Sequence, residues 1–570
     1  MTAPRTAAAL AVLLLACEPA PTSPSTSPAP TPDPAPEPSA PPTVVTETVP
    51  GALPPTLAAD PPPGIVTTDV SVDLVPSDPD ATIVYTLDGR PPEVGVSPEW
   101  TGPVLLDRSA SIRAIATNAY GSVAWAGTWL RADPTVASFS SDLPVAVLWS
   151  NEAAPVVKTE VFSRFTVSTF EPDFSGRTTW PANAALSTRA GLKIRGSSSA
   201  GYPKHPYRLE TWRADADLDT DVVLLGMPEE ADWVLGAPLD FDRALMRDPL
   251  MFALSNAIGR TASRTEFAEL FVAELGETVG MDDYVGVYVF TERIERDADR
   301  VAITPLLPTD LAEPEVTGGY IFKEDRLGPG ESGFTAGTAG GRLDFQQPFV
   351  FVDPNEDELA GEQKTYLSSV LDDLGWALAS PDFTNPNTGH HYADLIDVDA
   401  WIDHHILNVL SKNPDSFRLS GFFTKDREGP IAAGPLWDFD RTMGCASDSR
   451  AANPTWWDAS NETSDCTYVF DHGFWRGLFA DPAFRDAYFA RWRVLLDTSL
   501  SVATIDLVID GMAAQLTEAA VRNYAAWPAY PPRGPDHAAE VATLKTWLHT
   551  RHAWIDGCLD LPDPRACPGS

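Results

Sequence analysis

Residues 401–444 constrain the fold more than any other stretch, because several local signals follow one another there. Apolar positions at helical spacing predict a helix over residues 401–412, which a polar break containing Asp415 then ends. Two short strand patterns around a turn near residues 426–430 predict a β-hairpin, and an acidic loop with Asp438 follows it. The segment therefore predicts a mixed domain in which one carboxylate follows a helix and another follows a hairpin, 23 residues later.

Four further blocks precede this segment. They read LKIRGSSSAGYPKHPYRLE, WVLGAPLDFDRALMRDPLMFAL, GVYVFTERIERDADRVAI and GGYIFKEDR. Together with residues 401–444 they resemble the spore-coat protein H (CotH) kinase family over roughly residues 143–559. The resemblance implies an α+β, atypical protein-kinase-like domain that transfers the γ-phosphoryl group of ATP to protein hydroxyls, with Mg²⁺ or Mn²⁺ as cofactor.

The resemblance also implies roles for the acidic residues of the segment. Asp415 matches the family's catalytic aspartate and Asp438 its metal-binding aspartate, while Asp440 and Asn413 are further candidates for metal contacts. Mg²⁺ prefers oxygen ligands and retains waters, so one or two carboxylates suffice. The alternatives are a turn residue beside proline for Asp415, and a calcium loop or plain solvation for Asp438 and Asp440.

A glycine- and serine-rich turn at residues 196–201, between two predicted strands, leaves backbone N–H groups free to approach an anion. By the resemblance, this turn covers the nucleotide phosphates and Lys204 contacts one of them, although a plain polar hairpin is the alternative. Lys323 competes with Lys204 as the phosphate lysine, and Glu292 is either near adenine or solvated. The candidate nucleotide-binding residues are Arg195, Ser197, Ser198, Lys204, Glu292 and Lys323.

Two more helices are predicted from apolar spacing, over residues 242–258 and 357–379. Pro249 stands close to the start of the first of them. Both helices belong to the kinase-like domain that the resemblance implies.

One position departs from the family pattern. Members closest to the spore-coat kinases have an asparagine before the strand that follows the catalytic aspartate, and Ser420 stands there in this chain. A hydroxyl is a poorer metal ligand than an amide carbonyl. Two alternatives to a kinase therefore stay open: a non-catalytic envelope-assembly or binding protein, and a glycosidase with Asp415 and Asp438 as its carboxylate pair.

The N-terminal residues predict export and anchoring. Residues 1–16 carry one arginine and a short apolar run, as in a signal peptide. The sequence LLAC at residues 14–17 resembles a bacterial lipobox, which implies lipid attachment to Cys17. An ordinary signal peptide is the alternative. Residues 17–63 are rich in Pro, Ser and Thr and predict an extended tether. We expect an exported, membrane-anchored lipoprotein of the bacterial outer membrane or cell surface.

Residues 64–131 alternate apolar and polar positions between turn signals, which predicts a small antiparallel sandwich. The motifs YTLDGRPP, WTGP and SIRAIA resemble those of the chitobiase/β-hexosaminidase C-terminal domain, an immunoglobulin-like accessory module. Trp100, Trp125 and Trp129 are candidates for a carbohydrate-stacking platform. Tryptophans of a small sandwich lie more often in its core, so core packing is the favoured interpretation.

Four cysteines besides Cys17 suggest two local disulfides, Cys445–Cys466 and Cys558–Cys567, in an oxidising compartment. A zinc site is the weaker alternative, because neither a CxxC pair nor a neighbouring histidine accompanies them. The second pair extends into a short C-terminal tail, residues 560–570.

The charge of the chain limits its partners. Lys and Arg number 40 against 80 Asp and Glu, which gives a net charge of −40 at pH 7. Such a surface repels nucleic acid and weakly favours a basic, Ser-rich protein substrate at the cell surface. Nucleic-acid binding is therefore not expected.

Two histidine pairs, His390-His391 and His404-His405, suggest a metal site at first sight. Adjacent residues on a helix point to different faces, and no third ligand is spaced to join either pair. We therefore expect surface or packing histidines.

Overall fold

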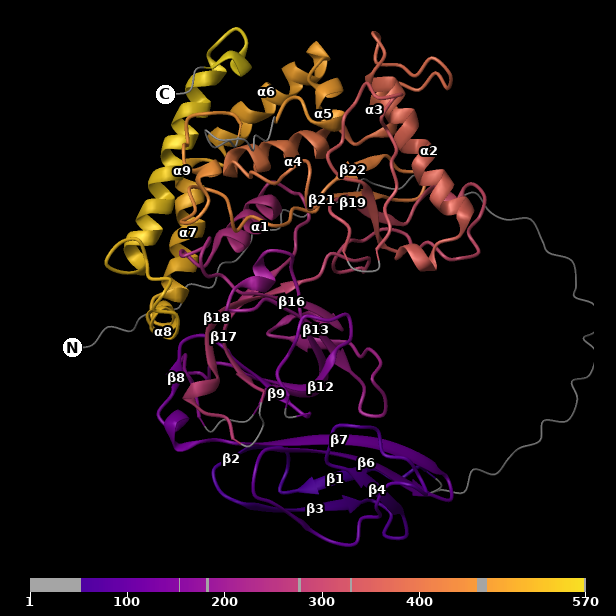
Figure 1. Ribbon diagram of the computed structural model, residues 1–570, viewed down its shortest axis with the longest axis vertical. Helices are drawn as coiled ribbons and strands as arrows, with labels where there is room; N and C mark the ends of the chain where they lie inside the picture. Colours follow the sequence, from indigo (N-terminus) through magenta and orange to yellow (C-terminus); the bar gives the residue numbers. More distant parts are fainter. Residues whose placement is uncertain are drawn as a thin grey trace, which may run out of the picture. The chain divides into compact units, whose positions relative to one another are not determined.

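The computed structural model describes residues 53–152, 154–180, 184–274, 278–328, 331–458 and 469–567. The predicted signal peptide, Cys17, most of the predicted tether and Cys466 lie outside these ranges. The described part of the chain contains both helices and strands (Figure 1). None of the helices found in it is long and apolar enough to cross a membrane.

The N-terminal β-rich domain consists of two sheets around one core, with strand orders β1-β3-β5 and β2-β7-β6-β4. Trp129 is fully buried in this core, and Trp100 and Trp125 are partly buried against it, so Trp129 has no face for stacking on a sugar. The strands are Leu57–Asp60 (β1), Gly64–Val66 (β2), Val70–Pro76 (β3), Thr82–Thr86 (β4), Val104–Leu106 (β5), Ala110–Asn118 (β6) and Gly121–Arg131 (β7).

A closed barrel follows, with the strand order β10-β12-β13-β16-β18-β17-β9. Its strands are Val145–Ser150 (β9), Ser163–Phe170 (β10), Leu186–Ile194 (β12), Tyr207–Trp212 (β13), Asp232–Gly236 (β16), Thr265–Ala273 (β17) and Tyr284–Glu292 (β18). Alternate residues of β18 pack into two different hydrophobic cores, because successive side chains of a strand point to opposite faces of the sheet. Tyr288 and Phe290 fill the barrel, whereas Val287 and Val289 join the core of the helical part.

Short strands pair in twos beside the barrel. They are Ser140–Ser141 (β8) with Thr178–Thr179 (β11), and Val222–Leu224 (β14) with Met227–Glu230 (β15).

The C-terminal part packs helices around the sheet β20-β19-β21-β22, and α1 shares its core and contacts α4 (Figure 1). The strands are Tyr320–Glu324 (β19), Phe349–Asp353 (β20), Gly421–Lys425 (β21) and Ile431–Ala433 (β22). The helices are Arg247–Ala257 (α1), Gly361–Leu378 (α2), Tyr392–Leu395 (α3), Val398–Ser411 (α4), Gly473–Leu478 (α5), Pro482–Asp497 (α6), Val502–Leu516 (α7), Ala519–Ala526 (α8) and His537–Leu559 (α9).

The helices predicted over residues 401–412 and 357–379 are confirmed as α4 and α2, and the hairpin after α4 is confirmed as β21 and β22. Helix α1 corrects the prediction for residues 242–258, because it begins only at Arg247. A proline fits the first turn of a helix, where its missing N–H needs no partner, so Pro249 requires a start shortly before it.

The cysteines differ in their surroundings. A disulfide joins Cys558, at the end of α9, to Cys567. Cys445 is buried and has no disulfide partner among the described residues. Its expected partner Cys466 lies outside the described residues, so that pairing stays a prediction.

His404 and His405 are packing residues of α4, as expected from their spacing. The ring of His404 lies parallel to that of Trp475, and its Nδ1 is buried without a hydrogen-bond partner in the described structure. His405 pairs through Nδ1 with the hydroxyl of Tyr488 at 2.8 Å and through Nε2 with the carbonyl of Val469 at 2.7 Å. Burial lowers the pKa of His404 to about 4 and that of His405 to about 3.

These depressed pKa values predict a loss of stability in mild acid. Below pH 6.5 a histidine gains a proton in the unfolded chain, whereas His404 stays neutral in the fold until about pH 4. The stability is therefore complete above pH 6.5 and falls by about 2 kcal/mol per buried histidine at pH 5. Urea unfolding at pH 7.5 and at pH 5.0 measures this effect. Between these two pH values, the free energy of unfolding should fall by about 2 kcal/mol less for His404→Gln than for the wild type.

The matched control is His390→Gln, because the side chain of His390 is 54% exposed. It should lose as much free energy of unfolding on acidification as the wild type does. An equal loss in His404→Gln and the wild type would contradict the prediction.

Candidate functional site

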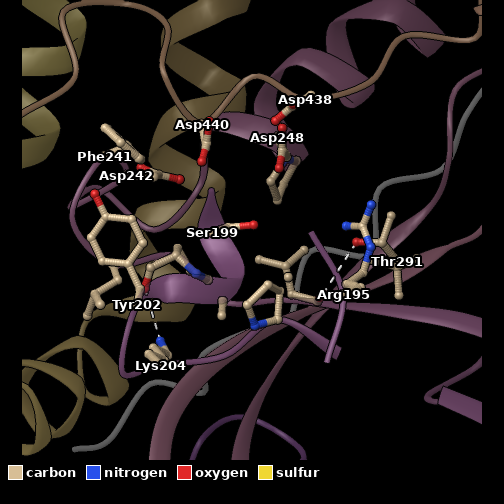
Figure 2. A pocket seen from close by; sticks show the side chains of 18 of the residues that line it. Arg195, Ser199, Tyr202, Lys204, Phe241, Asp242, Asp248, Thr291, Asp438 and Asp440 are labelled. Carbon is tan, nitrogen blue, oxygen red and sulfur yellow. Dashed lines mark hydrogen bonds between the residues drawn. The ribbon is translucent and has the colours of Figure 1, made fainter. Parts of the chain in front are cut away.

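A pocket of about 860 Å³, part of it open to solvent, lies between the barrel and the loop that follows β22 (Figure 2). Barrel residues such as Val234 of β16 and Val289 of β18 form an apolar wall. Phe252 of α1 and Trp437, whose rings stack at 5.8 Å, form another. A pocket with apolar walls and a few polar groups suits a small molecule.

Five aspartates line the pocket (Figure 2). Asp240 and Asp242 are paired with arginines, and the other three come from two separate elements. Asp248 comes from the first turn of α1, and Asp438 and Asp440 come from the loop after β22. In the part of the chain that the structure describes, no three His, Cys, Asp or Glu side chains converge closely enough to enclose a metal ion. Mg²⁺ usually needs only one or two carboxylates, with waters and phosphate oxygens as its other ligands, so this donor set fits it.

The electrostatics of the pocket favour a cation. Burial, followed by the nearby Asp438, raises the pKa of Asp248 to about 7. Burial and the carboxylates of Asp438 and Asp248 raise the pKa of Asp440 well above its usual range. Desolvation and Asp415 raise the pKa of Asp438, although its side chain is exposed and water screens part of this effect. A divalent ion would relieve this mutual repulsion.

The first turn of α1 holds the acidic loop in place. Asp248 Oδ1 accepts a hydrogen bond from the backbone N–H of Phe439 at 2.6 Å. Arg247 is fully buried and donates from Nε to the carbonyl of Thr442 at 3.0 Å and from Nη1 to Asp242 at 2.6 Å. Directly before the attachment at Phe439, Asp438 adopts a left-handed backbone with φ of 67°. The turn thereby determines where the loop's carboxylates point.

Lys204 does not have a free ammonium group. It is buried in the pocket wall, and its Nζ donates to the carbonyls of Pro238 and Val287 and to Asn523 Oδ1. Asn523 comes from α8 and fits because Gly286 has no side chain, since a Cβ there would lie 2.4 Å from Asn523 Oδ1. Burial lowers the pKa of Lys204 well below its usual range. Its role here is to join the barrel to α8, which corrects the expected contact with phosphate.

Arg195 is the better candidate for an anion. It follows β12, lines the pocket and lies 5.6 Å above the ring of Trp437. Its guanidinium makes no hydrogen bond or ion pair of normal length with any residue that the structure describes. A partly exposed guanidinium opposite three carboxylates can bind a phosphate whose metal ion those carboxylates hold.

Glu292 and Lys323 do not line the pocket. Glu292 is buried and accepts hydrogen bonds from the backbone N–H and Nε of Arg264, both at 2.9 Å, which corrects its expected place near adenine. Lys323 is paired with Asp325 at 3.1 Å, and Asp325 is close enough to help raise the pKa of Asp438. Lys323 therefore lies at the edge of the site with its charge already neutralised.

Ser197 and Ser198 are exposed in the turn between β12 and β13. Ser198 Oγ accepts a hydrogen bond from Arg441 Nη2 at 3.0 Å. Ser199, which the sequence did not single out, lines the pocket itself.

Asp415 lies beside the pocket, not in its lining, and two arginines bind it. Oδ1 accepts from Arg418 and from Arg450, each at 2.9 Å. Its neighbours Ser416 and Arg418 line a second pocket of about 490 Å³. Asp415 therefore stands between two cavities.

Asn413 is engaged in holding the backbone. Its Oδ1 accepts from the backbone N–H groups of Asp415 and Ser416, and its Nδ2 donates to the carbonyl of Asp438 at 3.1 Å. These bonds leave the amide a structural role, which corrects its expected metal contact. Ser420, with φ of 51°, does not line the pocket either.

Comparison with known families identifies the part of the chain that contains this pocket. The family model described as CotH kinase protein matches residues 192–555, a range that contains every residue lining the pocket. The chain belongs to the CotH kinase protein family. The family expected from the sequence blocks is thus confirmed, and the chitobiase/beta-hexosaminidase C-terminal domain model matches residues 61–123. No curated protein matched the chain in a search of complete sequences.

Arg195 lines the CotH pocket, whereas Lys204 uses its ammonium group for hydrogen bonds within the fold. Substitution of Arg195 should therefore weaken ligand binding, and substitution of Lys204 should lower stability. Arg195→Met should reduce the affinity for inorganic triphosphate about 10- to 100-fold, because a charge-assisted hydrogen bond contributes about 1.5–3 kcal/mol. Its free energy of unfolding should stay within about 0.5 kcal/mol of the wild type, since no hydrogen bond is lost. Isothermal titration with Mg²⁺ present and urea unfolding measure both quantities.

Lys204→Met is the matched variant. It should retain triphosphate binding but lose about 1–3 kcal/mol of stability, because buried acceptors such as Asn523 Oδ1 are left unsatisfied. The opposite pattern, with lost binding and unchanged stability, would make Lys204 the phosphate ligand after all.

Proposed function

We propose that the CotH domain has an atypical protein-kinase-like architecture and transfers the γ-phosphoryl group of ATP to hydroxyls of a protein substrate, as a Ser/Thr-type phosphotransferase. The observation that carries this proposal is the unpaired guanidinium of Arg195 opposite Asp248, Asp438 and Asp440 in one pocket. A triphosphate with its metal ion needs both charges at once, whereas a neutral ligand such as a sugar needs neither.

Different residues of the pocket suit different parts of a nucleotide. The apolar wall formed by Val234 and Val289 suits a base, and Arg195 suits phosphate oxygens. Asp438, supported by Asp440 or Asp248, would hold Mg²⁺ or Mn²⁺. When bound, the ion supplies neutralisation of charge on the phosphate oxygens.

Asp415 would orient the acceptor hydroxyl and accept its proton. A bond forms between the hydroxyl oxygen and the γ-phosphorus as the bond to the β-phosphate oxygen breaks, and ADP leaves. The second pocket is lined by Ser416 and Arg418, the neighbours of Asp415 in sequence and contact, and is the candidate site for the acceptor. The charge of −40 favours a basic, Ser-rich acceptor at the cell surface.

The second candidate is a non-catalytic surface or envelope-assembly protein that uses the same fold for binding. Ser420 supports it, because a hydroxyl replaces the amide expected of an active member. The ion pair of Asp415 with Arg418 supports it as well, since this arginine competes with an acceptor hydroxyl for Oδ1 of Asp415.

Nucleotide-dependent stabilisation of the purified protein tests the proposal. ATP with Mg²⁺ or Mn²⁺ at a hundredfold excess over its Kd should add about 2.7 kcal/mol to the free energy of unfolding, and Asp438→Ala should abolish this gain. Asp415→Asn should keep the gain and lose transfer of radiolabelled phosphate to a basic, Ser-rich peptide. Metal-dependent binding without any transfer by the wild type would favour the non-catalytic protein. The absence of nucleotide binding with either metal would contradict the kinase and would favour the non-catalytic protein as well.

We also propose that the protein is an exported lipoprotein anchored through Cys17 to the bacterial outer membrane or cell surface. The signal-peptide pattern, the lipobox-like LLAC and the Pro-rich tether support this. The N-terminal module is a candidate for carbohydrate contact there, through Trp100 and Trp125 alone.

Substitution of Cys17 tests the anchor. Cys17→Ser should abolish incorporation of radiolabelled palmitate and move the protein from the membrane fraction to the soluble fraction, because the thiol carries the lipid. Cys445→Ser, which changes a buried thiol, should stay labelled and membrane-bound. A labelled Cys17→Ser variant would contradict the lipoprotein proposal.

A further inference from the structure

A chain of alternating charges connects Asp415 to the serine turn beside the nucleotide pocket. Arg450 contacts both carboxylate oxygens of Asp415, from Nη1 to Oδ1 at 2.9 Å and from Nη2 to Oδ2 at 3.3 Å. The same guanidinium donates to Asp448, from Nε at 3.0 Å and from Nη2 at 2.6 Å. Arg450 is only 8% exposed, so these contacts form away from bulk water.

The chain continues on the far side of Asp448. Arg441 donates from Nη1 to Asp448 Oδ2 at 3.3 Å and from Nη2 to Ser198 Oγ at 3.0 Å. Its guanidinium lies 3.8 Å above the ring of Phe241, which lines the nucleotide pocket. Although burial opposes it, hydrogen bonds from Arg450 and Arg441 lower the pKa of Asp448, so this carboxylate stays charged between its two arginines.

We infer that Asp448 and Arg450 are positioning residues, which fix the plane of the Asp415 carboxylate and couple it to Ser198 in the turn over the nucleotide. This inference rests on the proposed function. A two-point contact by a guanidinium sets the orientation of a carboxylate, which the single contact of Arg418 does not. An aspartate that receives a proton in the transition state gains from such a fixed orientation.

A second Asp-x-Arg turn in the chain shows which contacts of Asp448 and Arg450 serve the local turn alone. Asp448 caps the short turn Ser449–Ala451 and accepts from the backbone N–H and Nε of Arg450. Asp563 caps Pro564–Ala566 and accepts in the same way from Arg565, at 3.1 and 3.0 Å. The Asp-x-Arg pair therefore forms a stable turn without a catalytic partner, and the contact with Asp415 is an addition to it.

Steady-state kinetics of phosphate transfer from ATP to a basic, Ser-rich peptide tests the inference. Arg450→Gln should lower kcat about 100-fold and Arg450→Lys about 10-fold, because lysine restores the charge but only one contact. Asp448→Asn should lower kcat about 10-fold with the KM for ATP changed less than about threefold. The control variants Asp563→Asn and Arg565→Gln should leave both constants unchanged.

Coupling to the turn is measured with Ser198→Ala. Alone it should lower kcat, and in the Asp448→Asn background it should lower kcat no further, since the connection is already broken. Additive effects would overturn the coupling.

The outcomes separate this inference from the function on which it rests. Wild-type protein that neither binds nor transfers phosphate contradicts the proposed function, and binding without transfer counts against both. An active wild type with unaffected Asp448→Asn and Arg450→Gln variants overturns the inference alone. It is also overturned if the variants unfold at lower urea in proportion to their loss of kcat and Arg450→Lys gives no rescue, because the role would then be structural.

Discussion

The buried ion pair between Arg247 and Asp242 is the interaction on which the site depends. The guanidinium is fully enclosed at the start of α1 and also binds the carbonyl of Thr442, 195 residues further along the chain. Removing one partner of such a pair leaves an uncompensated buried charge, which costs about 3–5 kcal/mol. The pair joins α1 to the acidic loop, and Asp248 adds a second attachment through Phe439. The carboxylates of the loop are therefore set by the start of α1.

The charged groups around the pocket differ in whether the fold already provides them with partners. The chain carries a net charge of −40, so a free cation inside a cleft is informative. The Nζ of Lys204 is occupied by hydrogen bonds to carbonyl and amide oxygens in the wall, whereas Arg195 lines the cavity. Asp415 is held by arginines on the other side of the acidic loop. The cation that faces the cavity and the carboxylate held by arginines are thus separate groups. Arg450, Asp448 and Arg441 connect Asp415 to Ser198 in the turn after β12.

Local signals were sufficient for the elements around the site. Helix α4, the hairpin after it and the strands β12 and β13 follow from periods of 3.6 and 2 residues, which neighbouring residues decide by themselves. The start of α1 was placed too early, because apolar spacing alone does not show where a proline can be tolerated. Asp248 was missed for a related reason. It stands in the sequence block that carries the resemblance, but its meeting with Asp438 requires two segments that the folded chain brings together.

By itself the sequence determined the family, the order of the elements and the presence of carboxylates after α4 and after β22. Only the tertiary structure decided which charges are free. Lys204 and Arg195 looked equivalent as cations beside a glycine-rich turn, yet the partner that occupies Lys204 is Asn523, 319 residues away. Glu292 and Asn413 lost their expected roles in the same way, to Arg264 and to the backbone around Asp415. Whether a polar group can bind a ligand depends on whether the fold has already satisfied its hydrogen bonds, and those partners come from distant parts of the chain.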